Sequence, residues 1–467
     1  MTAAAAPMNA RTKLLLHGPV VRTLLMLAWP NVVVQLAQAS SGLIETFWVA
    51  KLGTDALAGM ALVFPAVMLV QMVSGGAMGG GISSAIARAL GAGRRDEANA
   101  LVLHALVVNV AIGGTFAVLA LVFGPALYHL LGGHDASLSA ALRYSNVVFA
   151  GSILIWLVNA LASVLRGTGN MLVPSAVICG GIVVLVPLSP CLIFGIGPFP
   201  ALGVAGGAVA LLVYYALALV VLGWYVLSGR SIVRLHLAPL RWSSFWSILK
   251  VGAVASLVSL QTNVTIALTT GLVGAAAGPA AIAGFGTATR LEYLLIPLAF
   301  GFGAPLVAMV GTCIGAADTA RAAHVAWVGA GITFALTEAI GVTAAVWPRA
   351  WLELFGRDPG MLAAGTAYLH VVGPFYGFFG AGMALYFASQ GAGRLLWPLL
   401  AGLLRVTVAA VGGYLALRLT GSLTSLYAAV ALALVAFGSV NIIAVWRGTL
   451  RAAPHTHRQR RFAAPAA

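Results

Sequence analysis

The fold is decided by residues 167–229, which read GTGNMLVPSAVICGGIVVLVPLSPCLIFGIGPFPALGVAGGAVALLVYYALALVVLGWYVLSG. These 63 residues contain no Asp, Glu, Lys or Arg, and they are bounded by Arg166 and Arg230. A transmembrane helix needs about 20 mainly apolar residues, so the stretch predicts two helices joined at the Gly/Pro-rich turn 195–203. The chain is therefore predicted to be a membrane protein.

The composition of the whole chain agrees with this prediction. Of 467 residues, 61% are hydrophobic and 7% are charged, whereas soluble domains have about 45–50% and 25%. This excludes a water-soluble enzyme and a disordered chain. The net charge of +15 is scattered among apolar blocks, so it does not indicate nucleic-acid binding. The three cysteines form no CxxC pair, which argues against a disulfide scaffold and a metal site.

The apolar segments predict an all-α polytopic membrane protein with twelve transmembrane helices. The expected spans are 24–50, 56–86, 99–124, 142–164, 171–195, 203–227, 248–274, 281–312, 323–347, 361–389, 395–417 and 424–446. With the N-terminus in the cytoplasm, 18 of the 25 Lys and Arg residues fall in cytoplasmic segments and 4 in external ones. Since cytoplasmic loops are enriched in Lys and Arg, we expect both termini in the cytoplasm of a bacterial inner-membrane protein. The basic tail (Arg458, Arg460, Arg461) is expected to contact anionic lipids.

The two halves of the chain repeat at one offset of 224 residues. Nine identical pairs share this offset, including Tyr144 with Tyr368 and Gly91 with Gly315. Six spans separate the equivalents, so the halves have the same orientation, and transporters built this way bind substrate at the repeat interface. The expected organisation is two pseudo-symmetric six-helix lobes. Its parts are a cytoplasmic N-terminal tail (1–21), the N-lobe (22–229), a cytoplasmic linker (230–247), the C-lobe (248–446) and a basic cytoplasmic tail (447–467).

A polar stripe on the first predicted helix ends in an acid. Its members are three or four residues apart and share one helix face: Asn31, Gln35, Gln38, Ser41 and Glu45. A polar face within a bilayer should meet protein or a wet cavity. A carboxylate there can take a proton near neutral pH or hold a cationic drug, so Glu45 is predicted to couple transport to an ion. The alternative is that Glu45 only pairs with Lys51 or Arg290 near the outer interface.

The repeat extends this stripe into the second half without its acid. Adding 224 to Gln38, Ser41 and Glu45 gives three threonines, which are further cavity-lining candidates: Thr262, Thr265 and Thr269. Pro30 lies inside the first helix, where it weakens the helix locally. A bend there could link protonation of Glu45 to the shape of the cavity, and a static kink is the alternative.

Four more charged residues lie within predicted spans: Arg290, Glu292, Glu338 and Arg405. Arg290 and Glu292 are two positions apart and do not face each other on a helix. Each therefore needs another partner, which could lie across the lobe interface. Structural or gating ion pairs are at least as well supported a role for them as direct contact with substrate. Glu338 and Arg405 are expected to pair within the second lobe.

Several blocks of this sequence resemble the multidrug and toxic compound extrusion (MATE) family over about residues 20–446. They are LAWPNVVVQLAQASSGLIETFWVAKLGTDALAG (27–59), ARALGAGRRDEA (87–98), LRGTGN (165–170), ATRLEYLLIPLAFGFG (288–303) and FASQGAGR (387–394). The resemblance implies two six-helix lobes, a V-shaped central cavity and export of organic cations or drugs coupled to H⁺ or Na⁺ entry. It also implies a coupling role for the acid at Glu45, where the family usually carries Asp.

This chain departs from the family pattern at two places. Some members carry an acid on helix 7, where this chain has threonines, and many carry Asp-Pro on helix 5, where this chain has Ser189-Pro190. Ser189 remains a cavity-lining candidate, but a serine cannot relay charge as Asp does. Glu45 would then act largely alone.

The predicted function is secondary efflux of amphipathic organic cations by alternating access, in antiport with H⁺ or Na⁺. The protein is expected to be a monomer that needs no cofactor and contacts membrane lipids. A flippase or exporter of lipid-linked or saccharide substrates is the first alternative, although the neutral-to-acidic stripe favours cations. An intramembrane enzyme is the second, but no HExxH, GxSxG or Walker motif is present.

Overall fold

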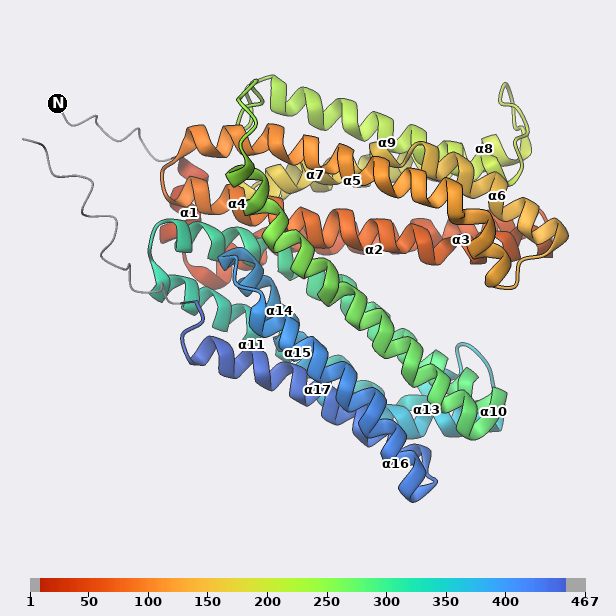
Figure 1. Ribbon diagram of the computed structural model, residues 1–467. Helices are drawn as coiled ribbons and strands as arrows, with labels where there is room; N and C mark the ends of the chain where they lie inside the picture. Colours follow the sequence, from red (N-terminus) through yellow and green to blue (C-terminus); the bar gives the residue numbers. More distant parts are fainter. Residues whose placement is uncertain (1–8, 451–467) are drawn as a thin grey trace, which may run out of the picture.

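The computed structural model describes residues 9–450, apart from the side chains of Pro279, Tyr293 and Leu294, and this part of the chain is helical (Figure 1). Before the first span lies a short helix, α1 (Ala10–His17). The basic tail from residue 451 on, with Arg458, Arg460 and Arg461, lies outside the described residues.

The helices of the first half are α2 (Val20–Ala50), α3 (Thr54–Gln71), the π-helix η1 (Met72–Met78), α4 (Gly79–Gly91), α5 (Arg95–Leu130), α6 (Asp135–Ala150), α7 (Ser152–Gly167), α8 (Leu172–Phe194) and α9 (Val204–Leu227). Those of the second half are α10 (Trp242–Gly315), α11 (Thr319–Val346), α12 (Pro348–Leu352), α13 (Pro359–Val372), the 3-10 turn η2 (Gly373–Phe375), α14 (Tyr376–Ala392), α15 (Leu396–Thr407), the π-helix η3 (Val408–Gly412), α16 (Gly413–Thr420) and α17 (Leu423–Trp446).

The predicted all-α membrane fold is confirmed. Within residues 9–450, 11 helices are long and apolar enough to cross a membrane, and the bent pair α6 and α7 makes a twelfth span. Helix α10 contains two of the spans, because Gly278, with φ 75° and ψ −168°, interrupts it at the predicted break. The fourth span begins at Asp135 rather than at 142, because polar side chains such as Ser139 and Arg143 mask its first turns in the hydropathy pattern.

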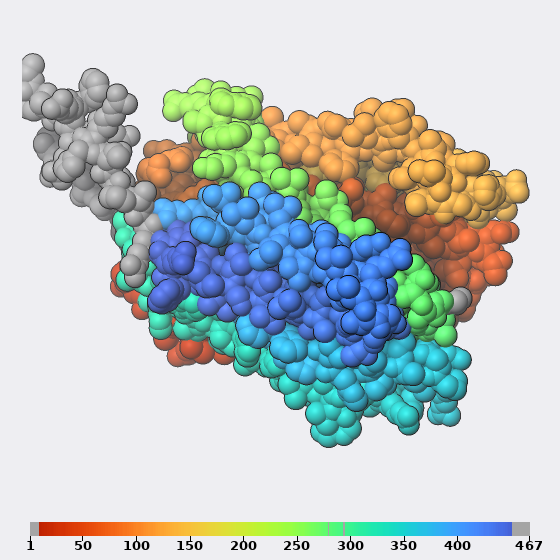
Figure 2. Space-filling view, turned by 60° about the horizontal axis from the view of Figure 1, so that its bottom comes forward, coloured from red at the N-terminus to blue at the C-terminus, as the bar shows by residue number. Residues whose placement is uncertain are grey.

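Two separate hydrophobic cores define two lobes. One core is built from buried residues between Val34 and Ile248. The other is built mainly from residues between Val251 and Leu450, together with Leu15 to Ala28, Ala77 and Met171. Figure 1 shows the two bundles meeting at one end and diverging toward the other, and Figure 2 shows α11 to α17 covering the near face of the molecule. We name these ends the closed end and the open end.

The closed end is held by a symmetric helix crossing between α4 and the last turns of α10. A Cβ on Gly91 would overlap the carbonyl oxygen of Thr312, and a Cβ on Gly315 would overlap that of Arg88. Since both pairs are related by the 224-residue offset, the crossing obeys the predicted pseudo-twofold repeat. Ser84 adds hydrogen bonds from its Oγ to the carbonyl oxygens of Gln390, at 2.6 Å, and Gly391, at 2.9 Å.

Helix α1 lies across this closed end. Leu15 and Leu16 belong to the second core, whereas Leu15 also lies against Gly169 in the loop after α7. Arg321, at the start of α11, donates hydrogen bonds to the carbonyl oxygens of Leu15, at 3.2 Å, and Gly18, at 2.5 Å. Part of the segment expected to be the N-terminal tail (1–21) is therefore packed on both lobes.

Candidate functional site

Glu45 lies inside the first lobe, between α2, α6 and α9. Its Oε1 accepts a hydrogen bond of 3.1 Å from the hydroxyl of Tyr144 on α6. A Cβ added to Gly207 on α9 would lie 2.9 Å from the same oxygen, so this glycine leaves room for the carboxylate. The site is therefore built from three helices that are far apart in the sequence.

The interpretation that Glu45 pairs with a nearby cation is wrong. The ammonium group of Lys51 lies over the rings of Phe47 and Trp48, 4.7 Å from each centroid. The guanidinium of Arg290 lies over Phe355 of the second lobe, at 5.2 Å. Between residues 9 and 450 the structure contains no ion pair of Glu45 with any Lys or Arg, so its recorded polar partner is a neutral tyrosine.

A network of polar side chains continues from this site toward the middle of the lobe. Tyr215 on α9 lies within electrostatic reach of Glu45, and its hydroxyl accepts a hydrogen bond from the amide of Gln71. The amide of Asn159 on α7 donates to Oε1 of Gln71, at 3.4 Å, and to Oγ of Ser74, at 2.8 Å. Together they form a hydrogen-bonded chain of neutral groups from Tyr215 to Ser74, whose first member lies within electrostatic reach of the acid.

This network sits where α3 changes into the π-helix η1. Gln71 is the last residue of α3, and Ser74 lies within η1. π-helical segments often mark functional sites, because they shift side chains out of the regular helical register. Sequence reasoning missed these residues because it searched the spans for ionisable groups; an uncharged amide in an apolar span, as at Gln71 and Asn159, was the available signal.

The second lobe contains a related pair with a different acid. Tyr368, which the repeat relates to Tyr144, donates a hydrogen bond to Glu292. The position equivalent to Glu45 is Thr269, in the first span of α10, whereas Glu292 comes from the second span of α10, after the break at Gly278. In each lobe the equivalent tyrosine therefore donates a hydrogen bond to a carboxylate, although the two carboxylates come from non-equivalent spans.

Comparison with known proteins decides the family. The MatE family model matches residues 30–191 and 255–415, which is more than half of the chain. The chain belongs to the MATE family. Members of this family are ion-coupled antiporters of the membrane and not enzymes, so the predicted family and class are both confirmed.

Curated relatives of this MATE protein carry two kinds of name. A "Probable multidrug resistance protein NorM" of Deinococcus radiodurans is 30% identical over 419 residues, covering 84% of this chain and 87% of the relative. An "FAD transporter" of Shewanella oneidensis is 27% identical over 411 residues, covering 86% and 90%. Among solved structures, an outward-facing multidrug resistance MATE transporter is 22% identical with a TM-score of 0.85, covering 95% of this chain and 98% of that one.

Other predicted site residues of this MATE protein satisfy their polar groups locally. Asn31 donates to the carbonyl oxygen of Leu27, at 3.2 Å, and Ser41 to that of Gln38, at 2.9 Å. The hydroxyls of Thr262, Thr265 and Thr269 likewise donate to carbonyl oxygens one turn earlier on α10. Gln35 and Gln38 are half-buried on α2. The hydroxyl of Ser189 is buried without a hydrogen-bond partner in the described part of the chain.

The expected pairing of Glu338 with Arg405 is wrong. Glu338 accepts a hydrogen bond of 2.6 Å from the backbone N–H of Gly377, near the N-terminus of α14, where N–H groups have no partner within the helix. Arg405 is buried with its guanidinium over Phe379, at 5.2 Å, and Phe437, at 5.7 Å. The opposite charge within its electrostatic reach is Glu292.

Arg290 and Glu292 do not bridge the lobes either. Both of their recorded partners, Phe355 and Tyr368, belong to the second lobe. Pro30 is buried, and α2 continues through it as one helix from Val20 to Ala50.

Proposed function

We propose that this MATE protein exports amphipathic organic cations in exchange for protons, and that Glu45 is the group that exchanges the two. The observation that carries the proposal is the hydrogen bond from Tyr144 to a carboxylate that has no Lys or Arg partner in the described part of the chain. A carboxylate within a membrane span needs a partner. Either a proton or a positively charged substrate can be the partner of this carboxylate, but not both at once. Such mutually exclusive binding is what antiport requires.

Protons suit this site better than Na⁺. A hard metal cation such as Ca²⁺ takes about six to eight oxygen ligands. Near Glu45 the described side chains offer its own carboxylate and the hydroxyls of Tyr144 and Tyr215. Binding a proton requires no such shell of oxygen atoms.

The proposed cycle is a rocking of the two lobes about the closed end. The closed end carries most arginines of the loops, including Arg88, Arg94 and Arg321, which supports its assignment to the cytoplasmic side. In this arrangement the open end faces outward. Protonation of Glu45 from outside releases the cation, and the return of the proton inside allows the next cation to bind.

Transport in reconstituted vesicles tests the role of Glu45. Efflux of a fluorescent organic cation is driven by a pH gradient or, separately, by a Na⁺ gradient, with Glu97→Gln as the matched control in the exposed Arg94–Glu97 pair. Glu45→Gln is expected to abolish pH-driven efflux, whereas Glu97→Gln retains it. Unchanged pH-driven efflux in Glu45→Gln refutes the coupling role, and efflux driven by Na⁺ alone refutes the choice of ion.

A flavin dinucleotide is the second candidate substrate. It is supported by the "FAD transporter" of Shewanella oneidensis, because the alignment with this chain covers 90% of that protein. Loading the same vesicles with FAD in place of the cation separates the two candidates. Gradient-driven movement of FAD without movement of the cation would replace the first proposal, including its argument for a positively charged cargo.

A further inference from the structure

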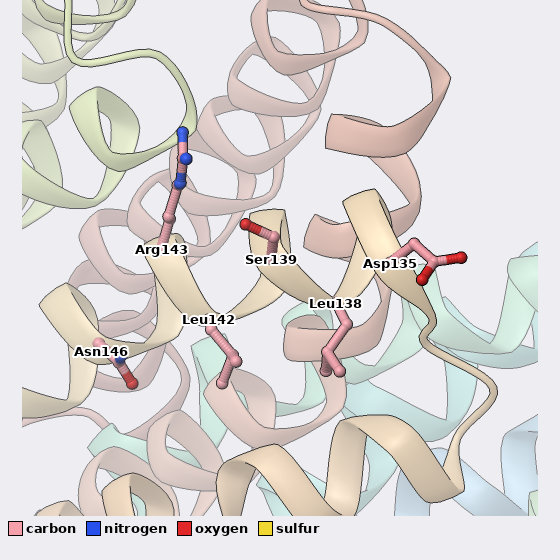
Figure 3. A pocket seen from close by; sticks show the side chains of 6 residues that line it. All are labelled: Asp135, Leu138, Ser139, Leu142, Arg143 and Asn146. Carbon is pink, nitrogen blue, oxygen red and sulfur yellow. The ribbon is translucent and has the colours of Figure 1, made fainter.

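A hollow of about 510 Å³ lies on the outer face of α6, near the open end (Figure 3). Six side chains line it: Asp135, Leu138, Ser139, Leu142, Arg143 and Asn146. Because they are spaced by three or four residues, they share one face of the helix. Tyr144, which binds Glu45, points from the opposite face, so the hollow is separate from the site described above.

This face of α6 is turned away from the second lobe. The principal contacts of α6 are with α3, α5 and α9, all in the first lobe. Figure 1 shows α6 in the bundle of the first lobe, near the ends of α3 and α8. At a rise of about 1.5 Å per residue, Arg143 lies about 12 Å along the helix from Asp135. The hollow therefore lies on the outer surface of the first lobe rather than in the space between the lobes.

The polar side chains of the hollow have no partners in the protein. Ser139, Arg143 and Asn146 are exposed, and across residues 9–450 the structure gives none of them a side-chain hydrogen bond, an ion pair or a ring contact. Arg290 and Arg418 at this end lie over the rings of Phe355 and Tyr414, whereas Arg349 and Arg357 are exposed as Arg143 is. A charged side chain on a membrane span is unfavourable unless a polar group meets it.

We propose that this hollow binds a phospholipid of the leaflet at the open end, with its phosphate on Arg143. A guanidinium and a phosphate form two parallel, charge-assisted hydrogen bonds, so this arginine provides the charge complementarity. Ser139 can donate to one of the remaining phosphate oxygens. Figure 3 shows Arg143 and Ser139 pointing to one side of α6, and Leu138, Leu142 and Asn146 to the other, so a phosphate would lie beside Arg143 and an acyl chain beside the two leucines.

The repeat does not place this site in the second lobe. Adding 224 to Ser139, Arg143 and Asn146 gives Ala363, Ala367 and His370, so the equivalent helix face lacks the arginine. The proposal therefore predicts one such lipid per chain.

Native mass spectrometry of the detergent-purified full chain, titrated with phosphatidylglycerol, tests the proposal. Wild type is expected to retain one tightly bound lipid, and Arg143→Gln to bind it about tenfold more weakly, because the charge-assisted hydrogen bonds to the phosphate are lost. The matched control is Arg349→Gln, which changes an exposed arginine of α12 in the other lobe and should leave lipid binding unchanged. The variant Ser139→Ala should weaken binding less than Arg143→Gln.

Three results would overturn the proposal. The first is equal retention of lipid by wild type and Arg143→Gln, with both proteins monodisperse. The second is displacement of the lipid by millimolar inorganic phosphate, which would mean that the hollow recognises the anion and not the lipid. The third is a wild-type dimer that Arg143→Gln dissociates, because the face would then be an interface between two copies. If Arg143→Gln does not fold, Ser139→Ala is compared with wild type instead, and equal retention of lipid by these two proteins overturns the proposal.

Discussion

Removal of the Arg321 side chain should loosen the closed end of the transporter. The guanidinium donates to the carbonyl oxygens of Leu15, at 3.2 Å, and Gly18, at 2.5 Å, and so ties α1 to the second lobe. Hydrogen bonds to a charged group contribute about 1.5–3 kcal/mol each, and the half-exposed position of Arg321 reduces this. A loss of about 2 kcal/mol for Arg321→Ala corresponds to a population shift of about 30-fold.

Cys313 provides a reporter for this change. It is fully buried at the closed end, beside Arg321, whereas the other two cysteines, Cys179 and Cys191, are half-buried on α8 and can be replaced by alanine. The labelling rate of Cys313 by a maleimide should then rise up to about 30-fold in Arg321→Ala, the factor given by the lost hydrogen bonds.

Arg94→Ala is the matched control for this measurement. Its side chain is 59% exposed at the same end and pairs with Glu97 within the first lobe. Labelling of Cys313 should remain at the wild-type rate in Arg94→Ala. An unchanged rate in Arg321→Ala, or an equal increase in both variants, would refute the conclusion that α1 holds the two lobes together at the closed end.

Three further substitutions follow from the contacts of the described residues. Gly315→Ala should raise Cys313 labelling and slow transport, because its Cβ would overlap the carbonyl oxygen of Arg88, whereas Gly331→Ala, which meets nothing within 4 Å, should do neither. Glu338→Gln should lower the unfolding temperature by only a few degrees, because it weakens a single cap on α14 worth about 1 kcal/mol. Arg405→Met should lower the unfolding temperature, because it removes the positive charge within electrostatic reach of the carboxylate of Glu292. Adding Glu292→Gln should recover part of the loss, and a double variant no more stable than Arg405→Met alone contradicts this interaction.

The spans could be predicted from the sequence because the bilayer imposes a length and a polarity on each of them. The repeat also predicted the equivalence of Tyr144 and Tyr368. It did not predict which acid each tyrosine binds. The acid of the first lobe, Glu45, lies on α2, whereas that of the second lobe, Glu292, lies in the second span of α10, after Gly278. Equivalent positions preserve the backbone path, whereas the placement of an acid is free to differ between the halves.

The predicted pairing of Glu338 with Arg405 was wrong for a different physical reason. Hydropathy gives the depth of a residue in the membrane but not the direction in which it points around the helix axis. Glu338 and Arg405 were both predicted to be deep, and both are within their lobe, yet they point toward Gly377 and toward Phe379 and Phe437. The same limit hid the contact of Gln71 with Tyr215, because it depends on the rotation of α3 against α9 and on the change to a π-helix after Gln71.

Under the proposed function, helix α2 would join the coupling site at Glu45 to the movement of the lobes. Its first turns, with Leu24 and Ala28, are buried in the second core, whereas Val34 and Val49 are buried in the first core beside Glu45. Pro30 stands between these two sets, at the point where α2 passes from one core to the other and where its backbone has one hydrogen bond fewer. A change in what Glu45 binds acts on the half of α2 fixed in the first lobe, and the other half is fixed in the second. The lobes can therefore rock only if α2 bends or slides between them, and Pro30 is where bending costs least.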